Sequence, residues 1–419
     1  MRLQDQQYFI GGVSVNDLAS QYDLPLYVYD FGKITRQYRR LEKAFSDCNF
    51  KIKYACKSNP NLSILKHIRN LGGGLDAVSI QEVWLAKEAG FKPEEILYTP
   101  NSVSMEEYRL AIEEGVRINI DNISTLEQFG HEFGDKVPVC IRINPHVLAG
   151  GNSKIQTGHI DSKFGISIHQ MRHTLRVIKA NNIRVEGIHM HTGSDILDAD
   201  IFLNALNILL DTAYEFEDLN YIDFGSGFKV GYKSDDVTTD VEELGQKVSS
   251  RFNEFCQSYG KDLELWCEPG KFLVSEAGYF LMKANVIKHT VATVFVGVDS
   301  GFNHMIRPMF YNAHHEIINT SNTSGPSRVY TVVGYICETD TFSSDRKLNE
   351  VREGDILAMK NAGAYAFAMS SNFNSRYRPA EVMVYDQQSH LIRERENFKD
   401  LVSHQKVPDI LKQEKANVR

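Results

Sequence analysis

The chain has 419 residues and a formal net charge of −8 at neutral pH, with 42% hydrophobic and 24% charged residues. This composition is that of an ordinary globular protein and argues against a disordered chain. Its mild acidity gives no electrostatic footprint for binding nucleic acid or an anionic membrane, so we expect neither partner.

The N-terminal segment MRLQDQQYF lacks the apolar core of a signal peptide, and no later run approaches ~18 consecutive apolar residues. The six cysteines are scattered and form no CxxC pair, so the sequence suggests neither a disulfide framework nor a structural zinc site. We therefore expect a cytoplasmic protein of enzyme size.

From about residue 50, short strand-like runs alternate with amphipathic helical stretches. Ile34, Tyr38, Leu41 and Phe45, for example, share one helical face just before the first strand. Eight such units in series predict a (β/α)8 barrel and favour closure over an open doubly wound sheet. The expected strands are Lys51–Lys57, Leu75–Ser79, Ile96–Pro100, Arg117–Ile120, Val137–Pro145, Arg184–His191, Tyr221–Gly225 and Leu263–Gly270.

After Ala277 the pattern changes to strands without long intervening helices, which predicts a β-rich second domain. The expected strands are Tyr279–Ile287, Thr293–Asp299, Arg328–Cys337, Asp355–Met359 and Glu381–Tyr385, and the strand-like run Pro25–Tyr29 is a candidate to join them. We expect the barrel over residues 30–278 and the β-rich domain over 1–29 and 279–419. The polar tail Asp400–Arg419 indicates a surface helix or a frayed end.

Unusual residues fall at the ends of the predicted barrel strands, where barrels carry their reactive groups. Lys57 ends the first strand, where it is either a solvated lysine or an amine that loses its proton readily and captures a carbonyl. His189 and His191 end the sixth strand on one face. With Asp223 they could bind a metal; alternatively, a histidine ring stacks on an aromatic cofactor beside the hydroxyl of Ser194.

The last two strands end in features typical of phosphate sites. Asp223-Phe-Gly-Ser-Gly227 brings glycines whose backbone N–H groups can approach a phosphate. Glu268-Pro-Gly270-Lys271 joins a carboxylate, a tight turn and a cation. An aldehyde-capturing lysine, a stacking histidine, a phosphate loop and a carboxylate for a ring nitrogen together indicate a site for pyridoxal 5′-phosphate (PLP).

The sequence resembles the alanine-racemase-like (fold type III) PLP decarboxylases, and within them the members that act on diaminopimelate. The resemblance runs from about Pro25 to Val384 and implies a PLP-binding barrel, a β-rich domain and a head-to-tail homodimer. The motifs that carry it are Tyr54-Ala-Cys-Lys57-Ser-Asn, Asp76-Ala-Val-Ser79, Arg142-Ile-Asn-Pro145, Thr157-Gly158, Ser162-Lys-Phe-Gly165, His189-Met-His191-Thr-Gly-Ser194, Asp223-Phe-Gly-Ser-Gly227, Glu268-Pro-Gly-Lys271, Arg307-Pro-Met-Phe-Tyr311, Cys337-Glu338-Thr and Asn361-Ala-Gly-Ala-Tyr365.

The resemblance implies a role for each cofactor-site residue. Lys57 would bind PLP as a Schiff base, Glu268 would pair with the pyridine nitrogen and His191 would stack on the ring. The phosphate would be held by Ser194, Gly227 and Gly270, and Tyr365 would also contact the cofactor. The family usually places arginine at the position of Lys271, a cofactor- and substrate-binding candidate, so this chain keeps the charge without the planar two-pronged grip.

The second domain is expected to choose the substrate. Cys337 would protonate the carbanion left by decarboxylation, because an ordinary thiol is mostly protonated at neutral pH; otherwise it is a small buried hydrophobe. By resemblance the Cys337–Glu338 loop enters the neighbouring subunit's barrel. Arg307, Tyr311, Glu338 and Tyr365 match positions that grip the distal carboxylate and ammonium of meso-2,6-diaminopimelate, so the expected products are L-lysine and CO2.

Three other functions remain open. A sister decarboxylase for carboxynorspermidine or another basic amino acid would not need an arginine for a distal carboxylate. A catalytically inactive regulatory paralogue would bind a partner protein without PLP. A metal hydrolase would use His189 and His191.

Overall fold

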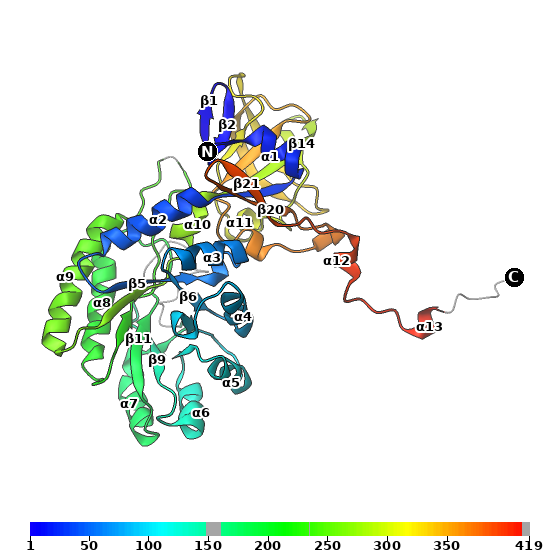
Figure 1. The fold of residues 1–419 in the computed structure, drawn as a ribbon. Coiled ribbons are helices and arrows are strands. Elements are labelled where there is room, and N and C mark those ends of the chain that lie inside the picture. Colours follow the sequence, from blue (N-terminus) through cyan, green and yellow to red (C-terminus); the bar gives the residue numbers. More distant parts are fainter. Residues whose placement is uncertain (148–160, 234, 413–419) are drawn as a thin grey trace.

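The computed structural model describes residues 1–147, 161–233 and 235–412. Two large sheets organise the described residues, a closed parallel barrel and a mostly antiparallel sheet that lies against one end of it (Figure 1), and a small three-stranded antiparallel sheet is formed by the N-terminal residues. Thr157-Gly158, one of the motifs behind the family resemblance, lies outside the described residues. In the described part, no helix combines the length and apolar character needed to cross a membrane.

Eight parallel strands form the barrel in chain order, and the last pairs with the first, which closes it. The predicted barrel is confirmed, and the open doubly wound alternative is wrong. A two-residue strand, β10 (Ile166–Ser167), adds to the barrel beside β9. The barrel strands are β5 (Phe50–Ala55), β6 (Gly74–Ala77), β7 (Ile96–Tyr98), β8 (Arg117–Ile120), β9 (Val139–Asn144), β11 (Val185–Met190), β12 (Tyr221–Asp223) and β13 (Glu264–Cys267).

Helices surround the barrel and bury one apolar face each against it (Figure 1). In α2 (Phe31–Ala44) the buried face carries Ile34, Tyr38 and Leu41 as predicted, and the Asp30 carboxylate caps the helix by accepting from the Lys33 N–H at 2.9 Å. The others are α3 (Leu62–Asn70), α4 (Ile80–Glu88), α5 (Met105–Glu113), α6 (Ile123–Phe133), α7 (Met171–Ala180), α8 (Ala199–Ala213) and α9 (Val241–Tyr259).

The second sheet is built around the long strand β14 (Gly278–His289), which pairs with the early strand β4 (Leu26–Asp30). The candidate strand before the barrel therefore belongs to this sheet, and all five predicted later strands are present. The remaining strands are β15 (Val294–Val298), β16 (Ile317–Asn319), β17 (Ser327–Val333), β18 (Thr341–Asn349), β19 (Ile356–Lys360), β20 (Ala380–Tyr385) and β21 (Gln388–Arg393).

Several elements differ from the sequence prediction. Strand β17 ends at Val333, four residues before Cys337, and the chain then bends through a loop. Strands β18 and β21 were not predicted; both lie at the edges of the sheet, where exposed polar residues weaken the alternation of apolar side chains. The N-terminal strands β1 (Arg2–Gln4), β2 (Gln7–Ile10) and β3 (Val13–Ser14), followed by α1 (Val15–Tyr22), were also not predicted.

The C-terminal tail runs away from the body of the molecule (Figure 1). It contains two short exposed helices, α12 (Phe398–Val402) and α13 (Asp409–Lys412). The expected surface helix is thus present in the described part of the tail.

The barrel and the second sheet are joined closely at the end of β13. The short helix α10 (Lys271–Val274) leads through a single 3-10 turn into β14. Gly363, from the loop after β19, packs so tightly that a Cβ there would overlap the Val274 carbonyl oxygen. The same loop is fixed by the Tyr365 N–H, which donates to the Ser58 carbonyl oxygen at 2.8 Å. This junction sets residues of the second sheet directly over the barrel mouth.

The contact between α2 and α9 gives a test of the packing. A Cβ at Gly245 of α9 would overlap the Ala44 carbonyl oxygen of α2. Gly245→Ala should therefore lower stability by about 1–3 kcal/mol, although alanine favours helix. The denaturant midpoint measures the effect, and Ser250→Ala, at an exposed position of α9, should leave it within about 0.5 kcal/mol. An unchanged midpoint for Gly245→Ala would show that the helices separate freely.

Candidate active site at the barrel mouth

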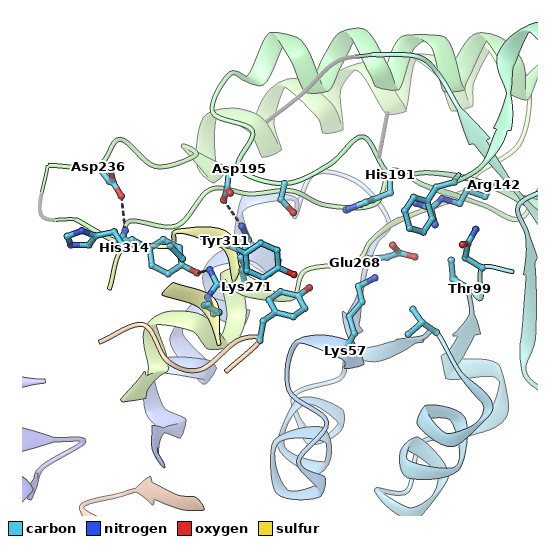
Figure 2. Close-up of a pocket in the computed structure, with 18 residues that line it drawn as sticks. Lys57, Thr99, Arg142, His191, Asp195, Asp236, Glu268, Lys271, Tyr311 and His314 are labelled. Carbon is cyan, nitrogen blue, oxygen red and sulfur yellow. Dashed lines mark hydrogen bonds and ion pairs between the residues drawn. The ribbon is translucent and has the colours of Figure 1, made fainter. Parts of the chain in front are cut away.

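A cavity of about 730 Å³ opens at the C-terminal ends of the barrel strands. The barrel contributes Lys57, His191 and Glu268 to its lining, and Figure 2 shows these three side chains directed toward one another. The second sheet region contributes a further set of lining residues, Arg307, Tyr311 and Tyr365. The structure thus brings together residues that are separated by up to 308 positions in the chain, from Lys57 to Tyr365.

A small lobe of about 40 Å³ extends this cavity between the ends of β11, β12 and β13. Its lining includes Ser194, Ser226, Gly227 and Gly270. Hydroxyl groups and exposed backbone at converging strand ends are the donors that hold a phosphate in barrels. The lobe therefore gathers three predicted phosphate residues and adds Ser226.

The loop after β12 requires its glycines. Gly227 has φ +130°, and a Cβ there would lie 2.5 Å from the Gly193 carbonyl oxygen. The Gly225 N–H donates to the Asp223 carboxylate at 2.8 Å, while the Gly225 carbonyl accepts from the Glu268 N–H at 2.8 Å. The loop is thereby tied to its own strand and to the next one.

Glu268 is a buried carboxylate that stays ionised. Burial raises its pKa, but His189, Lys57 and His191 outweigh burial and lower the pKa to about 2. His189 Nε2 lies 3.2 Å from Glu268 Oε2, while Glu268 Oε1 has no hydrogen-bond partner among the described residues. An unpartnered oxygen of a buried anion is suited to accept a proton-bearing nitrogen of a ligand.

Two more buried acids lie close to Glu268. Burial, and next the Glu268 charge, raise the pKa values of Asp76 and Asp223. Donor atoms of His189, Asp223 and Glu268 all lie within 4.8 Å of one another, so the described residues hold a group with metal-ligand spacing. His191 is not part of this group, and the predicted His189/His191 pair is divided: His189 is buried beside Glu268, while His191 lines the cavity.

Lys57 differs in one respect from the expectation. Burial lowers its pKa, but the carboxylates of Asp76 and Glu268 and the Tyr365 phenol raise it above its ordinary value. Lys57 Nζ donates to Asp76 Oδ2 at 3.4 Å. The prediction that the barrel mouth makes this lysine lose its proton readily is therefore wrong for the chain alone, because the neighbouring acids stabilise the ammonium.

His191 presents a neutral ring to the cavity. Burial, then Lys57 and Arg142, lower its pKa to about 3. Its Nδ1 accepts from the Ser226 N–H at 3.3 Å, which fixes the ring at the edge of the glycine loop. A fixed and uncharged ring is suited to stacking on an aromatic ligand.

Lys271 is buried and already has an anionic partner. Its Nζ donates to Asp195 Oδ1 at 2.5 Å, and Figure 2 shows the pair at the cavity wall. Asp195 directly follows Ser194, so the ion pair joins the loop after β11 to the first residue of α10. Sequence reasoning missed Asp195, because an acidic residue in a loop carries no periodic signal.

Arg307 and Tyr311 lie at the two ends of the short helix α11 (Arg307–Tyr311), and both line the cavity. The Arg307 guanidinium lies 5.8 Å from the Tyr311 ring centre and 5.4 Å from that of Tyr232. Tyr232, in the loop after β12, was not predicted. Arg142, buried within β9, was noted only as part of a motif, although a charged residue inside an apolar strand is a usable signal.

Cys337 and Glu338 do not reach the cavity of their own chain. Both side chains are exposed in the loop after β17, so the alternative of Cys337 as a buried hydrophobe is wrong. Cys337 faces a shallow surface depression where Asn374 Nδ2 donates to its sulfur at 3.1 Å. Within one chain, the candidate proton donor is therefore separated from the candidate lysine.

Comparison with known proteins identifies the family to which this chain belongs. Residues 31–275 match the family described as pyridoxal-dependent decarboxylase, pyridoxal binding domain. Diaminopimelate decarboxylase of Methanothermobacter thermautotrophicus is 40% identical over 412 residues, covering 95% of each chain. The chain belongs to the diaminopimelate decarboxylase family of pyridoxal-dependent decarboxylases. The crystal structure of Methanocaldococcus jannaschii diaminopimelate decarboxylase matches with a TM-score of 0.89 and 32% identity, over 98% of both chains.

A more distant protein shares the fold at a much lower sequence identity. Lysine/ornithine decarboxylase of Vibrio vulnificus matches with a TM-score of 0.77 at 20% identity, over 89% of this chain and 98% of that chain. At this identity the likeness concerns the fold alone.

PLP is the cofactor of this family, and the described residues fit it. The unpartnered Glu268 oxygen suits a protonated pyridine nitrogen, the lobe around Gly227 suits the phosphate, and Lys57 lines both the cavity and the lobe.

The glycine loop gives a test of this fit. Gly227→Ala places a Cβ on a backbone with positive φ, only 2.5 Å from the Gly193 carbonyl oxygen. The strained loop should raise the PLP dissociation constant about 10-fold or more. Gly231→Ala, farther along the same loop, meets only ordinary contacts of 3.4 Å and beyond and should leave the constant unchanged. Titration of the apoenzyme by visible absorption measures both, and equal affinities would remove the loop from the cofactor site.

Proposed function

We propose that this chain decarboxylates meso-2,6-diaminopimelate to L-lysine and CO2, the last step of lysine biosynthesis. The observation that carries the proposal is a single cavity with Lys57 and Glu268 on the barrel side and Arg307 and Tyr311 on the other. It is supported by relatives named for this activity, including that of Archaeoglobus fulgidus at 35% identity over 96% of this chain and 97% of that relative.

The barrel residues would hold the cofactor. Lys57 would bind it through Nζ and give way to the substrate amine, and Glu268 would keep the ring nitrogen protonated. The neutral His191 ring would stack on the cofactor, with Ser194, Gly227 and Gly270 on the phosphate. When bound, PLP supplies the electron sink for the pair left at Cα as CO2 departs.

The second sheet region would select the substrate. Arg307, with Tyr311 and Tyr365, offers a cation and phenols to a distal carboxylate, and Glu338 would pair with the distal ammonium. Lys271, paired with Asp195, would keep the charge of the arginine usual in the family but not its planar two-pronged grip. A sister activity on carboxynorspermidine or another basic amino acid would leave Arg307 without an anionic partner.

We further propose a homodimer with shared active sites. The exposure of Cys337 and Glu338, away from their own chain's cavity, supports the entry of this loop into the partner subunit's barrel. There Cys337 would deliver a proton to Cα, and Asn374 would hold its sulfur. The six cysteines are all free thiols, which supports a reducing compartment such as the cytoplasm.

Incubation with meso-diaminopimelate and PLP should release CO2 and L-lysine in equal amounts. Arg307→Ala should lower kcat/KM about 100-fold or more, because a buried cation that pairs with the substrate is lost. Arg328→Ala, at an exposed arginine on β17, is the control and should retain full activity. Normal turnover of diaminopimelate by Arg307→Ala would mean that Arg307 does not bind the distal carboxylate, and a wild type that releases no lysine would mean that the substrate assignment is wrong.

Subunit mixing tests the shared site. Lys57→Ala and Cys337→Ala should each be nearly inactive alone. After dissociation and reassociation of an equal mixture, activity should return to about a quarter of wild type, because half of the dimers are hybrid and each hybrid has one intact site. Activity that stays at the level of the separate variants would place both residues in one subunit's site.

A further inference from the structure

Two buried cations on the substrate side of the cavity differ in how they are held. Lys271 contacts the carboxylate of Asp195 at 2.5 Å, so its charge is cancelled locally. Arg307 has no carboxylate partner within ion-pair distance among the described residues; its hydrogen-bond partners there are an imidazole and a phenol. The charge of Arg307 is therefore kept for a ligand.

A chain of hydrogen bonds fixes the Arg307 side chain. Its Nε donates to His315 Nε2 at 3.3 Å, and one terminal nitrogen donates to the Tyr232 hydroxyl at 3.2 Å. Behind them, His315 Nδ1 lies 2.9 Å from the Lys360 carbonyl oxygen, and the Tyr232 hydroxyl lies 3.1 Å from Ser275 Oγ. The guanidinium is thus held from β19 on one side and from the turn after α10 on the other.

The contacts of His315 define its tautomer. A carbonyl oxygen can only accept, so Nδ1 carries the proton toward Lys360 and Nε2 is left as an acceptor for Arg307. His315 is 1% exposed, and burial together with the Arg307 charge lowers its pKa to about 3. At neutral pH the imidazole orients the guanidinium and adds no charge of its own.

This contact also restricts how Arg307 can grip an anion. A guanidinium binds a carboxylate with two parallel N–H groups, either side-on through Nε or end-on through its two terminal nitrogens. Because Nε donates to His315, the end-on mode remains. The N–H groups that His315 and Tyr232 do not use are those of the terminal nitrogens.

We propose that His315 is a positioning residue for substrate selection, which holds Arg307 by a neutral acceptor so that its terminal nitrogens meet the anionic end group of the substrate. This inference rests on the proposed function and deepens it. His315 acts through Arg307 and has no part in the decarboxylation step itself.

Two isosteric halves of histidine separate positioning from packing. His315→Asn keeps a donor at the place of Nδ1 for the Lys360 carbonyl but removes the acceptor for Arg307. His315→Gln brings an amide oxygen to the place of Nε2 and can restore that acceptor. His315→Asn should raise KM for meso-diaminopimelate about 10-fold with kcat within about 3-fold of wild type, whereas His315→Gln should stay within about 3-fold in both.

Two ligands test which end of the substrate is affected. L-lysine keeps the carboxylate that would face Arg307, and cadaverine has the same chain and amines without any carboxylate. In the holoenzyme, His315→Asn should raise the inhibition constant of L-lysine about 10-fold and leave that of cadaverine unchanged. A purely structural role predicts that both constants rise and that the Gln variant is as impaired as the Asn variant.

The outcomes distinguish this inference from the proposed function. If wild type releases CO2 from diaminopimelate while His315→Asn matches it in KM and in lysine inhibition, the positioning role is wrong and the function stands. An equal rise in the inhibition constants of L-lysine and cadaverine, or a large loss of kcat, also contradicts the positioning role. If wild type does not act on diaminopimelate, the proposed function fails, and this inference fails with it.

Discussion

The site depends on the burial of one ionised carboxylate, Glu268, at the end of the last barrel strand. Removing a carboxylate from water is costly unless nearby groups compensate for it. Here His189, Lys57 and His191 together outweigh burial and hold the pKa of Glu268 near 2. The neighbouring acids, Asp76 and Asp223, have raised pKa values because burial and Glu268 both disfavour their ionised forms. Of these three acids, Glu268 alone has a lowered pKa, and it is the one that we propose pairs with the cofactor's ring nitrogen.

Three cationic side chains that line the cavity differ in the groups that they contact. Lys57 contacts the buried acid Asp76, and Lys271 forms an ion pair with Asp195. Arg307 donates hydrogen bonds only to neutral groups among the described residues. All three side chains line one cavity, but they differ in how far a neighbouring carboxylate offsets their positive charge. The tight packing at Gly363 and the hydrogen bond from the Tyr365 N–H to the Ser58 carbonyl hold the second sheet against the barrel.

Most of the barrel was predictable from sequence, because buried parallel strands leave short apolar runs and the reactive residues follow them directly. The gathering of Lys57, His191, Gly227 and Glu268 at the barrel mouth was predicted in this way, and their roles toward the cofactor stay proposals. The pairing of Lys271 with Asp195, and of Arg307 with His315, could not be found, since loops without periodicity bring these residues together. The raised pKa of Lys57 was missed for the same reason: it depends on Asp76, which reaches Lys57 only in the folded barrel.

The junction between the two sheets has an evolutionary consequence. Under the proposed roles, the residues that operate the cofactor come from barrel strand ends, and those that recognise the far end of the substrate come from residues 307–365. Changes in the second segment could then alter substrate preference without disturbing the electron sink. A descendant of this chain could acquire a new substrate by remodelling α11 and the loops around it, and the inherited barrel would continue to supply the same chemistry.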